Sequence, residues 1–156
     1  MPAASGGAGL FLQWSTPGFG IYRASGAYFV PVETDRATFH FVSGRFDGCP
    51  VDVPLGRSTV LEPCIGVELG GVTAAAKATS DLEASTERRW WVAGDLLLRT
   101  RFSPFPWIFS ELEVGAVVPF TRYVFLLGTE AAPRGEAHQV PGLGWVLGFS
   151  VGGRIL

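Results

Sequence analysis

The 156-residue sequence is short of several residue types, and each shortage excludes something. It has one lysine, two cysteines and two histidines. The net charge of −2 gives no electrostatic basis for a nucleic-acid partner. The histidines, His40 and His138, form no cluster with carboxylates, so we expect no metal site and no cofactor.

Long hydrophobic segments are also missing. The uncharged run 140–153 is too short and too rich in glycine for a transmembrane helix. Residues 1–7 lack the basic start and apolar centre of a signal peptide. The length predicts one domain over residues 1–156, and the 21 glycines and 11 prolines spread along it favour many strands over helices.

The clearest pattern is an alternation in residues 90–120. Its even-numbered positions are largely apolar: Trp90, Val92, Leu96, Leu98, Phe102, Leu112, Val114, Val118 and Phe120. Every charged residue between Arg89 and Glu113 lies at an odd-numbered position. Period two is the period of a β-strand, and residues 103–106 supply a turn. The stretch therefore predicts a hairpin with one charged face and one apolar face.

Weaker alternations predict five further strands. They lie at 8–14, 19–32, 38–49, around 61–69 and 140–156. In the second half of the chain the predicted connections alternate between long (73–87, 121–139) and short (103–106). Outer-membrane barrels keep short turns on the periplasmic side and longer loops outside. The count is seven strands, whereas bacterial barrels have even numbers, so we expect a further strand before residue 8 and hence an N-terminal truncation.

Two architectures accommodate these strands. In a soluble barrel or β-sandwich the apolar parity points inward, and in a membrane barrel it points outward to lipid. Aromatic residues gather near strand ends, as a membrane interface favours: Trp14, Phe102, Trp107, Phe120 and Trp145. We therefore predict an all-β, antiparallel up-and-down transmembrane β-barrel of about eight strands. A soluble lipocalin-like barrel that binds an apolar ligand, or a β-sandwich, is the alternative.

Three segments, 61–70, 111–119 and 148–154, carry a resemblance. They are similar to stretches of small, uncharacterised outer-membrane β-barrel proteins of myxobacterial type, of the eight-stranded class. The resemblance spans about residues 40–156. It implies the outer membrane of a Gram-negative bacterium as the location and outer-membrane lipid as the partner, and it implies no activity. We expect a monomer.

The two cysteines, Cys49 and Cys64, lie directly opposite each other if the intervening turn is centred between Gly56 and Arg57. Directly opposite residues on paired strands have Cβ atoms about 4.5–5.5 Å apart, within reach of a disulfide after small adjustment. We predict a Cys49–Cys64 disulfide and an oxidising compartment. Two buried free thiols are the alternative.

The charged parity would line the interior of such a barrel. This set is Arg23, Arg45, Asp47, Glu62, Glu68, Arg89, Asp95, Arg99, Arg101, Glu111, Glu113 and Arg154. We expect these residues to form an ion-pair network that fills a narrow lumen, with no catalytic residue among them. A membrane-barrel lipid hydrolase is the second alternative, with His40 and His138 as the only candidate bases.

Overall fold

The computed structural model describes residues 5–16, 18, 20–33, 37–76, 86–121, 124–129, 132–139 and 142–153. Ten strands lie in these residues: β1 (Gly7–Thr16), β2 (Gly20–Glu33), β3 (Ala37–Cys49), β4 (Val53–Pro54), β5 (Thr59–Ala76), β6 (Thr86–Phe105), β7 (Ile108–Pro119), β8 (Val124–Thr129), β9 (Ala132–Gln139) and β10 (Gly144–Gly153). The described part of the chain holds no helix long and apolar enough to cross a membrane.

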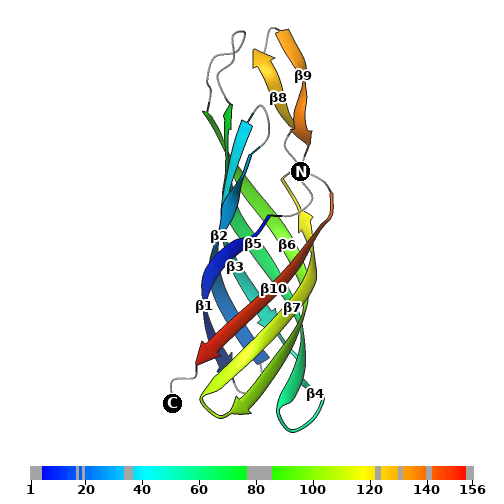
Figure 1. The fold of residues 1–156 in the computed structure, drawn as a ribbon. Coiled ribbons are helices and arrows are strands. Elements are labelled where there is room, and N and C mark those ends of the chain that lie inside the picture. The colour runs from blue at the N-terminus through cyan, green and yellow to red at the C-terminus, as the bar shows by residue number, and fades with distance from the viewer. Residues whose placement is uncertain are drawn as a thin grey trace.

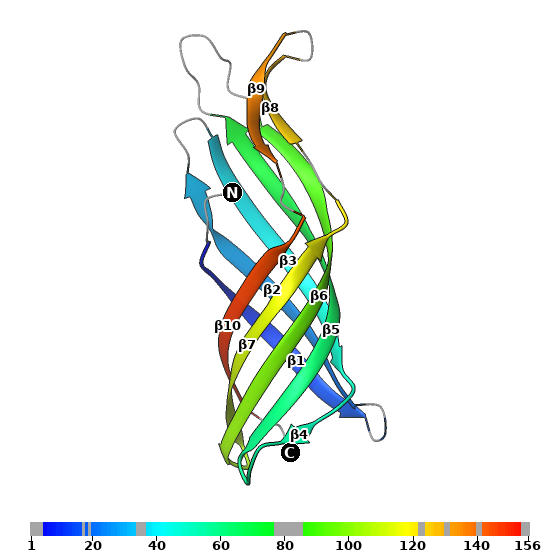
Figure 2. The same cartoon turned by 90° about the vertical axis from the view of Figure 1, so that its right-hand side faces the viewer.

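Eight of these strands form one sheet. Its order is β1-β2-β3-β5-β6-β7-β10, with β4 paired to β5, and every pairing is antiparallel. Figures 1 and 2 show the strands wound obliquely around a common axis, so that the sheet is strongly curled. The all-β, up-and-down prediction is confirmed, and a single curled sheet excludes the β-sandwich alternative.

The hairpin predicted over residues 90–120 is formed by β6 and β7. Leu98 lies opposite Val114, and Arg99 lies opposite Glu113. Apolar residues of β6 therefore face apolar residues of β7, and charged residues face charged residues. The register shifts between Phe102 and Phe105, which extends β6 into the predicted turn. The long connection predicted over residues 121–139 contains a second hairpin, β8–β9. This hairpin forms a separate two-stranded sheet (Figure 2).

The two faces of the sheet are inverted relative to a soluble protein. Charged side chains are buried inside the curl, with Arg99 and Glu62 both 0% exposed. Apolar side chains face outward, with Leu96 66% and Leu147 76% exposed. The soluble lipocalin-like alternative places the apolar parity inside and is therefore wrong about which face is buried.

The edges of the sheet are β1 and β10, which run in the same direction. Direct pairing of these edges would be parallel, whereas every pairing formed within the described residues is antiparallel. One strand running opposite to both would satisfy the two edges. The prediction of a further strand and of an N-terminal truncation stays a prediction.

The two ends of the sheet differ. The end at which β3 begins and β5 ends, called the upper end here, lies near β8 and β9 and is drawn at the top of Figure 1. The opposite, lower end carries the β6–β7 turn and β4 (Figure 1). This asymmetry matches the predicted alternation of long and short connections.

Candidate functional site

The candidate site is a group of ion pairs inside the curl, at the lower half of the sheet. It begins with the β6–β7 register, which sets Arg99 opposite Glu113 and Arg101 opposite Glu111. Because side chains alternate between faces, these four residues all point inward. The strand period and the tight turn thus place two arginines beside two glutamates before any other strand is added.

The first cluster is built around Arg99. Its Nη2 lies 2.8 Å from both Asp47 Oδ1 and Glu113 Oε2. Arg45 Nη2 lies 2.5 Å from the other oxygen of Glu113, Oε1, and Arg45 Nε lies 3.5 Å from Asp47 Oδ2. Two arginines and two carboxylates from β3, β6 and β7 therefore form one closed group of alternating charge.

The second cluster is built around Arg101. Its Nη1 lies 2.9 Å from Glu62 Oε1, and its Nε lies 2.8 Å from Glu111 Oε1. The guanidinium of Arg23 binds the second oxygen of Glu111, and it also donates to Gln13 Oε1 at 2.6 Å. Here too, two arginines meet two carboxylates.

Every long strand of the sheet contributes to the two clusters, called the interior network below. Gln13 comes from β1, and Ser150 of β10 donates to Glu111 at 3.2 Å. The Arg23–Glu111 pair joins β2 to β7, which are not neighbours in the sheet, so it crosses the interior. Gln13 and Ser150 were not predicted, because a neutral side chain on the inward parity gives no charge signal.

Burial of these charges is expensive, and the geometry compensates for it. Removing ions from water costs several kcal/mol for each, which attraction offsets only when geometry and hydrogen bonding are good. The four arginines and four carboxylates of the network balance in charge. The guanidinium forks of Arg99 and Arg101 each contact two carboxylates, which is the arrangement that arginine suits best.

Three predicted members lie outside the interior network. Arg89 is exposed near the upper end and pairs with Glu87, because it stands at the beginning of β6, above the enclosed region. Glu68 accepts a hydrogen bond from Trp91 Nε1 at 3.4 Å. Asp95 is buried, yet neither of its carboxylate oxygens has a hydrogen-bond partner among the described residues. Arg154 lies outside the described residues.

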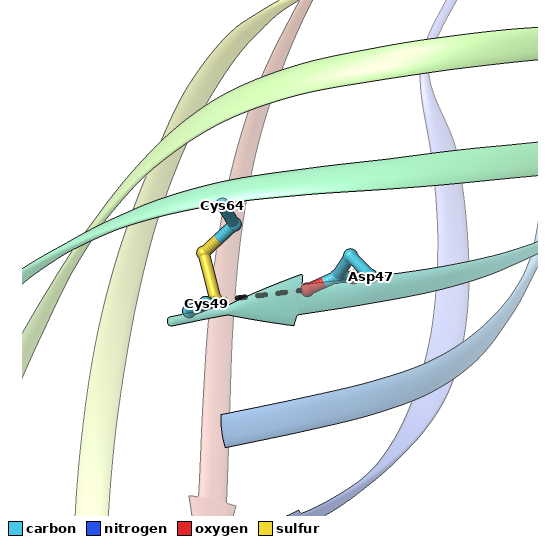
Figure 3. Close-up of side chains that lie close together, drawn as sticks. All are labelled: Asp47, Cys49 and Cys64. Carbon is cyan, nitrogen blue, oxygen red and sulfur yellow. Dashed lines mark hydrogen bonds between the residues drawn. A yellow bond between two sulfur atoms is a disulfide. The ribbon is translucent and has the colours of Figure 1, made fainter. Parts of the chain in front are cut away.

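A disulfide joins Cys49 of β3 to Cys64 of β5, beside the first cluster (Figure 3). The pairing of Gly48 with Ile65 continues by one step to these two residues, as the turn-centred register requires. Cys49 Sγ lies 3.9 Å from Asp47 Oδ1 and accepts a hydrogen bond from Arg99 Nη1 at 3.3 Å. The covalent link therefore clamps two strands at the level of the ion pairs.

Loss of this disulfide is expected to lower the free energy of unfolding by about 3 kcal/mol, the chain-entropy value for a loop of this size. The double variant Cys49→Ala/Cys64→Ala tests this by denaturant unfolding in detergent micelles. Reduced and unreduced parent protein provide the matched comparison. Thiol titration of the unreduced, unfolded chain is expected to find no free thiol, and two free thiols would contradict the disulfide.

A metal site and a hydrolase site both have little support in the described residues. Asp47, Cys49 and Cys64 offer ligand atoms within 4.8 Å of one another, but the sulfurs are bonded to each other and the carboxylate is paired with Arg99. His40 lies on the outer face of β3, away from the interior acids. The side chain of His138 lies outside the described residues. The hydrolase alternative thus gains no assembled site.

A cleft of about 480 Å³ opens at the lower end beneath the second cluster. Its lining includes Glu62 and Arg101 together with Asp52, Arg57 and Ser103. Two of these lining residues, Glu62 and Arg101, are bound to each other in the second cluster.

Comparison with known protein families, with curated proteins and with solved structures finds no match for this chain.

Proposed function

We propose that the protein is a monomeric β-barrel of the outer membrane of a Gram-negative bacterium, with a lumen closed by ion pairs. One observation carries this proposal: the buried side chains are charged and the exposed ones are apolar. Leu96, Ile65 and Leu147 are each at least 66% exposed, whereas Arg99, Asp47 and Glu62 are 0% exposed. Lipid is the solvent that suits such a distribution.

The size of the apolar surface supports a lipid partner. Monomeric soluble proteins rarely expose a contiguous apolar patch larger than a few hundred Å². Here exposed apolar side chains occur on all seven long strands, as at Leu10, Tyr28, Val42, Ile65, Leu96, Leu112 and Leu147. A sheet with exposed apolar side chains on every long strand is poorly suited to water.

Aromatic side chains mark both ends of this surface. Trp14, Tyr22 and Phe46 pack together near the lower end, with ring centroids 6.0–6.3 Å apart. Phe105 and Trp107 stack beside the lower turn. Trp90, Phe120 and Trp145 are exposed near the upper end, and aromatic girdles at both interfaces are typical of membrane barrels. The lower end would then face the periplasm and the upper end the exterior.

The interior network favours a structural or binding role over a pore. It crosses the lumen from β2 to β7 and engages the charged groups with one another. An ion that passed through would have to separate these pairs. In this proposal the barrel anchors the upper connections, including β8 and β9, at the exterior surface.

Reconstitution of the full chain in phosphatidylcholine vesicles tests the proposal. We expect the outward tryptophans to be quenched by brominated acyl chains and the strands to resist added protease. We also expect no ion conductance in planar bilayers, because the lumen is filled. A folded chain that stays soluble and monomeric at high concentration without detergent would overturn the membrane assignment, and stable conductance would overturn the closed lumen.

A further inference from the structure

A polar row crosses the outer face of the sheet at its upper end. His40 of β3 lies opposite Thr73 of β5, and Thr73 lies opposite Arg88 of β6. All three occupy the outward parity, since Val42 and Trp90, two residues further along their strands, are exposed apolar residues. Three neighbouring strands thus present an imidazole, a hydroxyl and a guanidinium side by side.

A groove of about 320 Å³ is lined by this row and by the residues below it. The next outward row is Val42, Gly71 and Trp90, which are paired in the register. Because Gly71 has no side chain, the Arg88 guanidinium can lie over it, between the valine and the tryptophan: a Cβ at Gly71 would be 3.6 Å from Arg88 Nε and 3.7 Å from Nη2. Gly44 and Leu69, paired one row further down, continue the lining, so that the groove has the polar row at its upper end and mainly apolar residues below it.

The arginine at this groove differs from the interior arginines in its charge partners. None of the residues that line the groove is acidic. Arg23, Arg45, Arg99 and Arg101 are all paired with carboxylates. Arg88, by contrast, is exposed and lies over the Trp90 ring, 5.9 Å from its centroid, with no carboxylate partner in the described part of the chain.

In the proposed membrane location, the row lies at the depth of a headgroup. Trp90 belongs to the upper aromatic girdle, and His40, Thr73 and Arg88 stand one row above it, on the side away from the apolar wall. Guanidinium forks match phosphate oxygens and can bind them through two parallel hydrogen bonds. The imidazole and hydroxyl add further donors. An acyl chain attached to that phosphate would enter the groove.

We propose that this surface, made of the His40–Thr73–Arg88 row and the Gly44–Gly71 groove, binds a phosphate-bearing anionic lipid of the exterior leaflet. The phosphate contacts the row, and one acyl chain lies in the groove against Val42 and Trp90. The inference rests on the proposed membrane location and adds a preferred lipid class to it.

Tryptophan quenching in vesicles tests the preference. The full chain is reconstituted in phosphatidylcholine that contains a minor fraction of brominated phosphatidic acid or, separately, the same fraction of brominated phosphatidylcholine. We expect the apparent affinity for phosphatidic acid to be about tenfold higher, as one charge-assisted contact predicts. Trp90→Phe should remove the excess quenching, which locates the signal at the groove.

Variants separate the headgroup from the acyl chain. Arg88→Gln should lose most of the tenfold preference, and Arg57→Gln, an exposed arginine at the lower end, is the matched control that should keep it. Gly44→Leu should block the chain, because a Cβ at Gly44 meets nothing closer than 3.7 Å and a longer side chain can extend into the groove. Equal affinities for both lipids, or an Arg88→Gln variant that keeps the preference, would overturn the inference.

Two readouts keep this test independent of the membrane assignment. Failure to insert into pure phosphatidylcholine vesicles overturns both proposals, whereas insertion without lipid preference overturns this one alone. Inorganic phosphate is added as a competitor. Displacement of the brominated lipid by phosphate at an affinity equal to that of the lipid would show that the row binds free phosphate, with no contribution from the groove, and would overturn the lipid assignment.

Discussion

Replacing Arg99 with methionine is expected to lower the free energy of unfolding by about 3–5 kcal/mol, the cost of breaking a buried pair from one side. Arg99 is fully buried and contacts Asp47 and Glu113 at 2.8 Å. Without Arg99, the two carboxylates share Arg45 as their remaining partner, so that one buried negative charge is left uncompensated. Denaturant unfolding in detergent micelles, followed by tryptophan fluorescence, measures the change.

The double variant Arg99→Met/Asp47→Leu tests whether charge balance stabilises the network. It removes one charge of each sign and leaves the Arg45–Glu113 pair intact. We therefore expect it to be more stable than Arg99→Met, because replacing a buried ion pair with apolar residues of similar volume is often neutral or stabilising. Arg89→Met, at an exposed pair near the upper end, should cost no more than about 1 kcal/mol. A double variant less stable than the single one would contradict charge balance as the principle of the network.

Replacing Leu96 with arginine is expected to destabilise the protein in vesicles by about 2–4 kcal/mol, the penalty for a lipid-facing arginine near the bilayer midplane. Leu96 lies midway along β6, between Trp90 of the upper girdle and Phe102 of the lower end, and is 66% exposed. In the proposed membrane location, its outward position puts the new charge into hydrocarbon. Unfolding of the reconstituted protein by denaturant measures the effect.

Leu143→Arg provides the depth control. Leu143 is an exposed residue just before β10, at the upper end, where a lipid-facing arginine costs about 0–1 kcal/mol. In water, by contrast, an exposed leucine replaced by arginine changes stability by about 0.5 kcal/mol or less. Equal and small effects at Leu96 and Leu143 would therefore show that the apolar face does not meet lipid.

Neighbouring-strand contacts were accessible from the sequence because they depend only on period and register. Shared parity predicts that Arg99 and Arg101 face Glu111 and Glu113 across the hairpin. The exact register was not accessible, because the turn lies at residues 106–107 and the register shifts between Phe102 and Phe105, inside the predicted turn. The Cys49–Cys64 link follows from the turn after β3. Parity, however, specifies the face of a residue and gives no depth. That is why Arg89, at the beginning of β6, was grouped with buried residues although it lies near the upper end.

Contacts across the interior were not accessible, because they depend on the curl of the whole sheet. Arg23 reaches Glu111 from β2 to β7, and Arg45 reaches Glu113 from β3 to β7, although neither strand pair is adjacent. No local pattern in the chain specifies how far the sheet bends. Asp95 likewise lacks a hydrogen-bond partner among the described residues because the curl sets which arginines come near it.

The sequence by itself determined that the chain forms antiparallel strands with one charged and one apolar parity, since an alternation of period two requires this in any β-sheet. It left open which parity is buried, because the same alternation suits a water-soluble barrel and its inverse. Only the tertiary structure decided that question: the sheet curls toward its charged face, where four arginines and four carboxylates pair at close range, and turns its apolar face outward.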